Sequence, residues 1–210
     1  GKRVALVREL LDKADAETKK RIEDFVCKLK AGGVEVEEIS CDLFEKANAA
    51  WQILMCAETC NNVSRYDGVK FGFRAEKYRN IDELYSNTRT EGFNFLTKAV
   101  ILYGSDVLSK TRYMDCYDKS LRVRRIIANE FARLFESFAA VITPVCSTAS
   151  FESYDISEAF GKVYGESEFT AAANLIGIPA VSGCGVQLLG AAFSEGTLLS
   201  LVKCAERMGK

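Results

Sequence analysis

The sequence predicts an α/β fold in which a mixed β-sheet is flanked by helices. Short apolar runs typical of strands occur toward both ends of the chain, at residues 2–7, 34–39, 140–143, 178–182 and 186–189. Segments with apolar residues at helical spacing separate these runs. No internal repeat, low-complexity tract or linker divides the 210 residues, so we expect a single region over 1–210.

The first elements are expected to form a strand–helix–strand unit. Residues 2–7 are an apolar strand, Asp15 is typical of a helix cap, and Gly32-Gly33 ends the helix that follows. The two strands of such a unit should be parallel and joined by a right-handed crossover. Apolar and charged residues alternate in the second strand, residues 34–39, which indicates a wet face near a sheet edge.

The middle of the chain is predicted to be mostly helical. Residues 64–79 contain two glycines and break the helical pattern, so we expect a loop there. Helices are predicted around this loop over 43–63, 81–90, 93–109 and 111–137.

The last third of the chain returns to strands. The apolar run from Ala140 reads as a buried strand that stops at Pro144. Residues 145–164 are Ser-rich and predicted to be irregular, and a helix is expected near 165–176. Two short strands separated by Gly183-Cys184-Gly185 have the loop length of a tight hairpin, and residues 195–208 are predicted to form a closing helix.

Composition excludes several kinds of site. The chain has no histidine, so neither Ser-His-Asp nor Cys-His catalysis nor a His-containing zinc site can be built from it alone. A general base here must be a carboxylate, Lys, Tyr or Cys. The net charge of −1 gives no whole-chain case for nucleic acid or an anionic membrane.

The start and the hydropathy of the chain favour a cytoplasmic protein with no membrane association. No apolar run reaches the roughly 18 residues of a membrane-spanning helix, and residues 1–7 lack the pattern of a signal peptide. The chain lacks an initiator Met and opens directly on the first predicted strand. We therefore expect natural sequence upstream of Gly1.

Eight cysteines are scattered over apolar or helical segments and are interpreted as reduced thiols. Cys56 and Cys60 are four residues apart on a predicted helix. A metal or redox pair is one interpretation, but no second pair and no histidine would complete a metal site, so small core residues are favoured and no metal is predicted.

Several motifs resemble the C-terminal half of the amidase signature family, and within it the A subunits of glutamyl-tRNA(Gln) amidotransferases. Those motifs run in matching order through essentially the whole chain. They include Arg65-Tyr-Asp-Gly68, Thr88-Arg-Thr-Glu-Gly-Phe93, Val141-Ile-Thr-Pro144, Ala173-Asn-Leu-Ile-Gly-Ile-Pro-Ala180 and Val186-Gln-Leu-Leu-Gly190.

The resemblance implies an amidohydrolase in which one Ser attacks an amide carbonyl while a second Ser and a Lys move the proton. In the A subunits the amide is that of glutamine, and the ammonia passes to a partner subunit that amidates Glu-tRNA(Gln). The Ser-Ser-Lys residues lie upstream of the region matched here, so no catalytic residue is predicted in this chain. The implied partners are the missing N-terminal part, subunits B and C, and tRNA through the complex; ATP and Mg would belong to a partner subunit.

By the same resemblance, three positions of this chain correspond to the groups that hold glutamine. They are an aromatic residue at Trp51 (or Gln52, one residue on), an Arg position occupied by Val100 and an acidic position occupied by Ser167. The Arg and the acid, which would pair with the α-carboxylate and the α-ammonium, are thus replaced. Charged residues that could substitute in a shifted register are Lys98, Glu166 and Glu168.

Two other groups of residues have both a functional and a structural interpretation. Arg65 and Asp67 are read as an internal salt bridge that fixes their loop, with a substrate-side contact as the alternative. A basic cluster, Lys119, Arg122, Arg124 and Arg125, is read as a solvated helix face, with phosphate binding as the alternative. Cys184 has no visible base beside it and is read as part of a turn.

Three functional hypotheses remain from the sequence. The chain is the C-terminal portion of an A subunit of an amidotransferase, inactive alone; or part of a stand-alone amidase that acts on another small amide; or a degenerate, non-catalytic binding module. The sequence upstream of Gly1 would discriminate among them.

Overall fold

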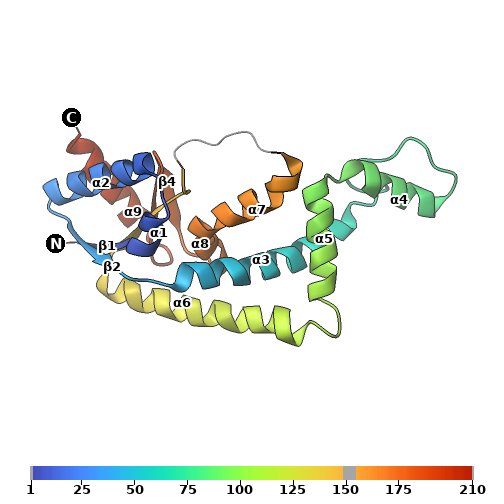
Figure 1. The fold of residues 1–210 in the computed structure, drawn as a ribbon, viewed down its shortest axis with the longest axis horizontal. Coiled ribbons are helices and arrows are strands. Elements are labelled where there is room, and N and C mark those ends of the chain that lie inside the picture. Colours follow the sequence, from blue (N-terminus) through green and yellow to red (C-terminus); the bar gives the residue numbers. More distant parts are fainter. Residues whose placement is uncertain (1, 149–154, 210) are drawn as a thin grey trace. The chain divides into compact units, whose positions relative to one another are not determined.

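The computed structural model of this chain describes residues 2–148 and 155–209. Strands occur toward the two ends of the chain, and the elements between β2 and β3 are helices joined by loops (Figure 1). The strands are β1 (Arg3–Val7), β2 (Glu35–Ile39), β3 (Ala140–Pro144), β4 (Ala180–Gly183) and β5 (Val186–Leu189). The α-helices are α1 (Arg8–Asp12), α2 (Ala16–Ala31), α3 (Leu43–Asn62), α4 (Ile81–Gly92), α5 (Phe95–Val107), α6 (Lys119–Ser137), α7 (Ile156–Glu166), α8 (Ala171–Ile176) and α9 (Glu195–Arg207).

The five strands form one mixed sheet in the order β2-β1-β3-β5-β4. β1 pairs with both β2 and β3 in parallel, whereas β5 runs antiparallel to both β3 and β4. The predicted α/β class is therefore confirmed, as are the parallel pairing of the first two strands and the edge position of the second.

The described residues separate into two compact units. Unit 1 comprises those within 1–51, 122–154 and 161–210 and contains the sheet. Unit 2 comprises those within 52–121 and 155–160 and is helical apart from the loop at its centre.

The core of unit 1 lies between one face of the sheet and the pair α2 and α9, which pack side by side (Figure 1). Alternate strand residues such as Val4, Ile142 and Leu188 meet Ile22 of α2 and Leu198 of α9 there. Alternation along a strand sends neighbouring side chains to opposite faces, so the next residues in line form the other face.

Local signals explain where α2 begins and ends. Asp15 accepts a hydrogen bond from the backbone N–H of Thr18 at 2.7 Å, as predicted for a helix cap. The backbone N–H of Gly32 returns to the carbonyl of Lys28, and Gly33 turns the chain with φ +81°.

The hairpin between β4 and β5 is as tight as its length predicted. Cys184 and Gly185 are the two loop residues, with φ +54° and +84°. Positive φ at both central positions is the pattern of a type I′ turn, whose twist suits a two-residue hairpin.

One prediction for the last third is wrong. Helix α7 occupies residues 156–166, most of which lie in the segment 145–164 that was expected to be irregular. Ala159 and Val163 have the i,i+4 spacing of a helix, a signal that the preceding serines hid. The helix expected over 165–176 begins later, as a 3-10 turn (Ser167–Phe169) followed by α8. Residues 149–154 of the irregular segment lie outside the described residues.

Within unit 2, α5 packs very closely on α3 through Gly104. A Cβ at Gly104 would lie 2.2 Å from the carbonyl oxygen of Cys56 and 2.7 Å from Cβ of Cys60. Such an approach is possible only without a side chain. Cys56 is buried at this contact, which agrees with the interpretation of this thiol as a core residue.

Candidate functional site

Two carboxylates gather beyond the carboxyl ends of β1 and β3 in unit 1. Glu166 accepts hydrogen bonds from the backbone N–H of Ser147, at 2.8 Å, and from its hydroxyl. Glu168 forms an ion pair with Lys13, and its side chain is only 17% exposed. In open α/β sheets, the carboxyl ends of parallel strands are where ligands most often bind, so this polar cluster is the natural place to look for a site.

The hydrogen bonds of this cluster fix the backbone of the segment after β3. Ser147 is held at three points, because its carbonyl also accepts from the backbone N–H of Asp15 at 2.7 Å. A serine hydroxyl bonded to a carboxylate is the first contact of an activated nucleophile. Here, however, the same carboxylate also holds the backbone of Ser147, so the pair joins the segment after β3 to the end of α7.

The thiols of Cys146 and Cys56 have raised pKa values, which favours their protonated form. Burial, followed by the nearby Glu166, raises the pKa of Cys146, whose thiol donates to the carbonyl of Thr148 at 2.9 Å. Burial raises the pKa of Cys56 to about 11. The reactive form of Cys is the thiolate, so neither thiol is prepared as a nucleophile at neutral pH.

The residues predicted at the glutamine-holding positions fall in different units. Trp51 is half-buried in α3, and Ser167 is half-buried with its hydroxyl donating to the carbonyl of Val163 at 3.0 Å; both belong to unit 1. Val100 lies in α5 of unit 2 and is 4% exposed, so it is a core residue there. Each position matched to a charged group thus carries a side chain with a local structural role.

The three charged residues that might have substituted are also occupied. Lys98 donates from its ammonium to the carbonyl of Thr90 at 2.7 Å, within unit 2. Glu166 binds Ser147, and Glu168 binds Lys13. None of the three is held toward an open binding space by these contacts.

The loop that contains Arg65 and Asp67 is held by backbone hydrogen bonds to Asp67 and not by the predicted salt bridge. No ion pair joins Arg65 to Asp67 in the described part of the chain, so the salt-bridge interpretation is wrong. Asp67 instead accepts from the backbone N–H groups of Val69, at 2.8 Å, and Lys70, at 3.1 Å. These two bonds lower its pKa, the bond from Val69 most of all. A short Asp side chain satisfies such a local turn better than it reaches a neighbouring guanidinium.

Two residues of the second motif, Thr88 and Arg89, hold the loop in place. The buried Thr88 Oγ1 accepts from the backbone N–H of Ala75 at 3.1 Å. The Arg89 guanidinium donates to the carbonyls of Val63 and Tyr66, at 3.2 and 3.4 Å. The motif of these two residues carries the resemblance, but no sequence pattern predicted that they hold the loop, because their partners lie 13 and 26 residues away in the chain.

Gly68 of the same loop has two reasons to be glycine. Its φ is +76°, and a Cβ there would lie 2.6 Å from Oγ1 of Thr88. A side chain at position 68 would therefore strain the backbone of the loop and collide with Thr88 of α4.

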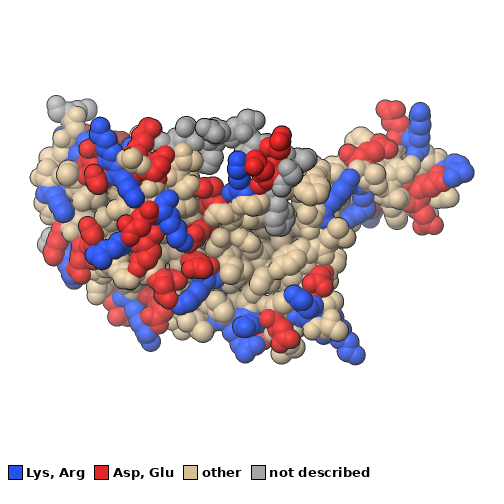
Figure 2. All heavy atoms as spheres, viewed as in Figure 1, with Lys and Arg blue, Asp and Glu red and all other residues tan. Residues whose placement is uncertain are grey.

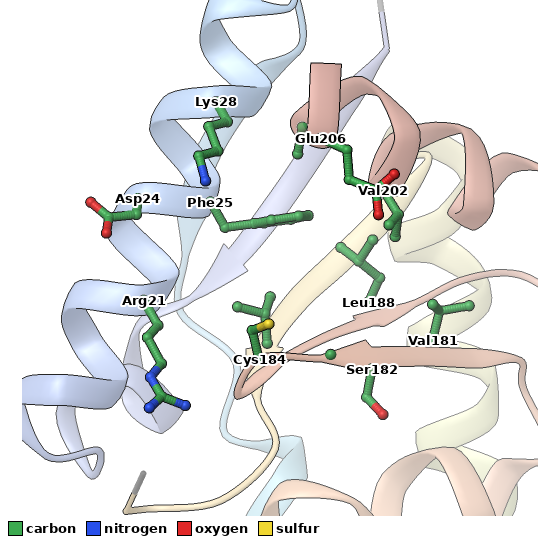
Figure 3. A pocket seen from close by; sticks show the side chains of 13 residues that line it. Arg21, Asp24, Phe25, Lys28, Val181, Ser182, Cys184, Leu188, Val202 and Glu206 are labelled. Atoms are coloured by element: carbon green, nitrogen blue, oxygen red, sulfur yellow. The ribbon is translucent and has the colours of Figure 1, made fainter. Parts of the chain in front are cut away.

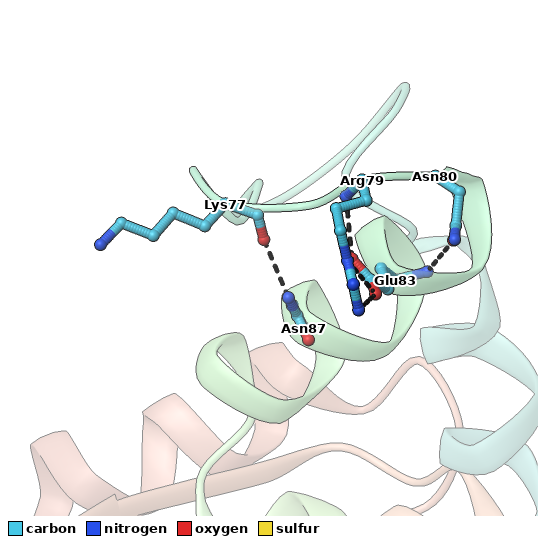
Figure 4. Close-up of polar contacts among 5 residues, drawn as sticks. All are labelled: Lys77, Arg79, Asn80, Glu83 and Asn87. Atoms are coloured by element: carbon cyan, nitrogen blue, oxygen red, sulfur yellow. Dashed lines mark hydrogen bonds and ion pairs between the residues drawn. The ribbon is translucent and has the colours of Figure 1, made fainter.

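The end of the loop is fixed to the start of α4 (Figure 4). Asn80 caps the helix by accepting from the backbone N–H of Glu83 at 2.9 Å, and Glu83 accepts from the backbone N–H of Arg79 at 2.8 Å. This reciprocal arrangement resembles a capping box. Asn87, one turn further on, donates to the carbonyl of Lys77 at 2.8 Å.

The face of unit 1 that is visible in Figure 2 carries charges of both signs. Acidic and basic side chains are interspersed over its visible face (Figure 2). In the basic cluster of α6, Arg124 donates to the carbonyl of Leu175 at 2.7 Å and so joins α6 to α8. This contact supports a structural role for that member of the cluster.

Neither a metal cluster nor a membrane span was found where the structure is described. No group of three or more Asp, Glu or Cys side chains could hold a metal ion among residues 2–148 and 155–209. Over the same residues, no helix is long and apolar enough to cross a membrane.

This chain matches only part of the length of its curated relatives. It is 34% identical to the A subunit of the glutamyl-tRNA(Gln) amidotransferase of Clostridium botulinum (strain Eklund 17B / Type B), over 100% of this chain and 45% of the relative. The chain thus spans less than half of the curated relative.

Solved structures show the same fold. The A subunit of the glutamyl-tRNA(Gln) amidotransferase of Thermotoga maritima matches with a TM-score of 0.66 and 23% identity, over 99% of this chain and 42% of that one. A bacterial aryl acylamidase matches with a TM-score of 0.71 and 13% identity, over 99% and 44%.

A family model settles the relationship that the motifs indicated. The model described as Amidase matches residues 1–199, which is nearly the whole chain. The five-stranded mixed sheet and its helices correspond to part of the solved relatives. This chain therefore belongs to the amidase family.

Proposed function

We propose that this chain is the C-terminal portion of an amidase-family protein of the amidotransferase A-subunit type. In the whole protein, the amide of glutamine is hydrolysed and the ammonia is delivered to a partner subunit that amidates Glu-tRNA(Gln). The 210 residues alone are inactive, and ATP and Mg belong to a partner subunit. The protein works in the cytoplasm, with B and C subunits and tRNA as its partners in translation.

The observation that carries this proposal is the extent of the similarity to A subunits. A 34% identity covers all of this chain yet only 45% of the relative. The loop at Arg65–Gly68 and the Thr88-Arg89 segment, which carry the resemblance, also contact each other directly. The identity over the whole of this chain supports common ancestry of this region with the A subunits.

The proposed chemistry divides between two portions of the protein. The nucleophilic Ser and its proton-transferring Lys are proposed to lie outside the 210 residues, because the Ser-Ser-Lys residues of the family lie upstream of the region that this chain matches. The role of this portion is to supply a rigid sheet and one wall of the amide-binding space.

The test is ammonia release from glutamine by two preparations. The 210-residue chain alone should release none above the buffer rate. The longest product of its gene, purified with any copurifying subunits, should release ammonia and support amidation of Glu-tRNA(Gln). Amide hydrolysis by the 210 residues alone would show that the catalytic groups are here after all. A gene product that is inactive in every preparation would favour the non-catalytic binding module.

A second function is supported by the residues at the two positions that were matched to charged glutamine-holding groups, which are Val100 and Ser167. Val100 is buried and Ser167 is bonded to Val163, and no substitute charge is free of a partner among Lys98, Glu166 and Glu168. A stand-alone amidase for an uncharged small amide needs neither charge. Competition between glutamine and an uncharged aliphatic amide discriminates the two functions: kcat/KM higher for the uncharged amide, with no tRNA amidation, would support the second.

A further inference from the structure

Three polar side chains lie side by side across the antiparallel part of the sheet. Gln187 of β5 is directly opposite Thr143 of β3 on one side and directly opposite Ser182 of β4 on the other. Residues paired in this way project from the same face of a sheet. We call these three residues the polar row; all of them belong to unit 1.

The polar row lies on the face of the sheet opposite the apolar core between α2 and α9. That core receives Leu188, the neighbour of Gln187 along β5. Figure 3 shows the same alternation in β4, where Val181 points to the side that carries Leu188 and Ser182 points to the other side. Gln187 is 4% exposed, whereas Ser182 is exposed. The polar row therefore leads from the protein surface into the interior.

The side-chain amide of Gln187 is fixed in one orientation. Its Nε2 donates to Oγ1 of Thr143 at 2.9 Å and to the carbonyl oxygen of Phe169 at 3.0 Å. A backbone carbonyl accepts and cannot donate, so the NH₂ end of the amide must face Phe169. Both hydrogens of that end are used. Oε1 is consequently turned away from Thr143, toward the Ser182 side of the polar row.

Two acceptors of the polar row have no partner in the described part of the chain. They are Oε1 of Gln187 and the hydroxyl oxygen of Ser182. Oε1 is not fully enclosed, because Ser194 Oγ is the one side-chain oxygen among residues 2–148 and 155–209 that is both enclosed and unbonded. A mostly buried amide oxygen is expected to meet a hydrogen-bond donor, and the described residues provide none for it.

The spacing of these two acceptors suits the nitrogen of a primary amide. Directly opposed residues of an antiparallel pair have Cβ atoms about 4.5–5.5 Å apart. The two N–H groups of a carboxamide diverge by about 120°, so acceptors bonded to both of them at ordinary lengths are about 5 Å apart. An ester of the same acid has no N–H and could bond to neither oxygen.

We propose that Gln187 Oε1 and Ser182 Oγ accept the two N–H groups of a substrate's primary carboxamide and so select amides over esters. The inference rests on the proposed function, which supplies an amide substrate. It places the –NH₂ group near the carboxyl end of β3, where Thr143 is the last residue but one and where ligands of α/β sheets most often bind. Thr143 and the carbonyl of Phe169 are positioning groups, because they act by holding the amide of Gln187.

The test compares an amide with an ester of similar size, using the longest product of the gene with its copurifying subunits. One pair is glutamine and the γ-methyl ester of glutamate; the other is an aliphatic primary amide and its methyl ester. Ser182→Ala should lower kcat/KM for the amide about threefold to tenfold and leave that for the ester within about twofold. Gln187→Met, which keeps the length of the side chain without its oxygen, should lower the amide value at least about tenfold and again spare the ester.

A third variant and a stability measurement control for indirect effects. Ser200→Ala on α9 is the matched control, since Ser200 is exposed and its hydroxyl donates to the carbonyl of Gly196; kcat/KM should not change for either substrate. Gln187→Met also removes the donor to Phe169, so thermal unfolding is recorded for every variant. If Gln187→Met does not fold, Ser182→Ala decides, because the exposed Ser182 side chain bonds to none of the described residues.

The possible outcomes separate this inference from the proposed function. Equal losses for the amide and the ester, or no loss for the amide, would overturn the inference and leave the function intact. Calorimetric binding of the intact amide is the readout for a preparation that hydrolyses nothing. Binding that weakens at least about threefold in Ser182→Ala would then support the carboxamide contact and contradict the function. A preparation that neither binds nor hydrolyses primary amides would overturn both.

Discussion

The internal contacts that stabilise unit 1 differ in kind from those that hold the long loop of unit 2. Unit 1 is organised by a sheet whose alternate residues meet α2 and α9 in one continuous apolar core. In unit 2, the long loop before α4 is held largely by polar bonds, from Asp67, Thr88 and Arg89 to backbone groups. Apolar burial tolerates many sequences of similar pattern, whereas a polar anchor depends on particular donors and acceptors. The two motifs of unit 2, Arg65–Gly68 and Thr88–Phe93, contain such polar anchors.

The largest effect is expected from the core of unit 1. Leu198→Ala removes a 0% exposed side chain and should lower the free energy of unfolding by about 2–5 kcal/mol. The neighbouring Leu199→Ala is the matched control; Leu199 is 52% exposed, and its change should cost about 0.5 kcal/mol or less. Urea unfolding followed by circular dichroism measures both. Equal costs would show that the core is not where the sheet and α9 place it.

A somewhat smaller effect is expected at the tightest helix contact of unit 2. Gly104→Ala puts a Cβ 2.2 Å from a backbone oxygen, and overpacking of this kind costs about 1–3 kcal/mol. Gly161→Ala on α7 meets nothing within 4 Å and should be neutral or stabilising by about 0.4–1 kcal/mol. The midpoint of thermal unfolding should therefore fall in Gly104→Ala and stay unchanged or rise in Gly161→Ala. A Gly104→Ala protein as stable as the original would mean that α3 and α5 can separate at little cost.

The hydrogen bond between the Ala75 N–H and Thr88 tests whether polar bonds hold the loop of unit 2. Thr88→Val keeps the shape of the side chain but leaves the backbone N–H of Ala75 without its acceptor, at a cost of about 1–3 kcal/mol. Thr90→Val, on an exposed position of the same helix, is the control. Hydrogen exchange of the Ala75 amide should accelerate in the first variant alone. Unchanged exchange in Thr88→Val would show that apolar packing, and not this bond, holds the loop.

The smallest effect is a pH dependence of the same loop. Backbone hydrogen bonds from Val69 and Lys70 lower the pKa of Asp67 below its usual value. A carboxylate with a depressed folded-state pKa adds stability that is present above the unfolded pKa and is lost as pH falls through the folded pKa. The loop should therefore loosen only at acidic pH, below the ordinary Asp range.

Nuclear magnetic resonance titration of the Asp67 carboxyl and of the Val69 amide measures this dependence. Asp67→Asn should remove the acid-induced shift of the Val69 amide. A midpoint at or above the ordinary Asp value would contradict the turn formed by Asp67 and the two amides.

Much of unit 1 was predictable because its signals are local. The cap at Asp15, the glycines after α2, and the two-residue hairpin each depend on a few adjacent residues, and the structure confirms them. The alternation of Val34-Glu-Val36 likewise placed β2 at an edge. Helix α7 was missed because the Ser-rich residues before it masked a short helical period.

The candidate site was less predictable than the fold. The positions Trp51, Val100 and Ser167 came from matching motifs, and they remain predictions. What no motif could show is that Glu166 and Glu168 bind Ser147 and Lys13, which are 19 and 155 residues away in the chain. Contacts between such distant residues are set by the packing of the sheet and its helices.

The sequence alone determined the class of fold, the family resemblance and the absence of histidine chemistry, because these depend on composition, periodicity and ordered motifs. The tertiary structure decided three further matters: that Asp67 closes a turn, that Thr88 and Arg89 anchor the loop, and that the buried amide of Gln187 is held in one orientation. The physical reason is the same in each case. A hydrogen bond of this kind exists only once the segments that make it have been brought to their places.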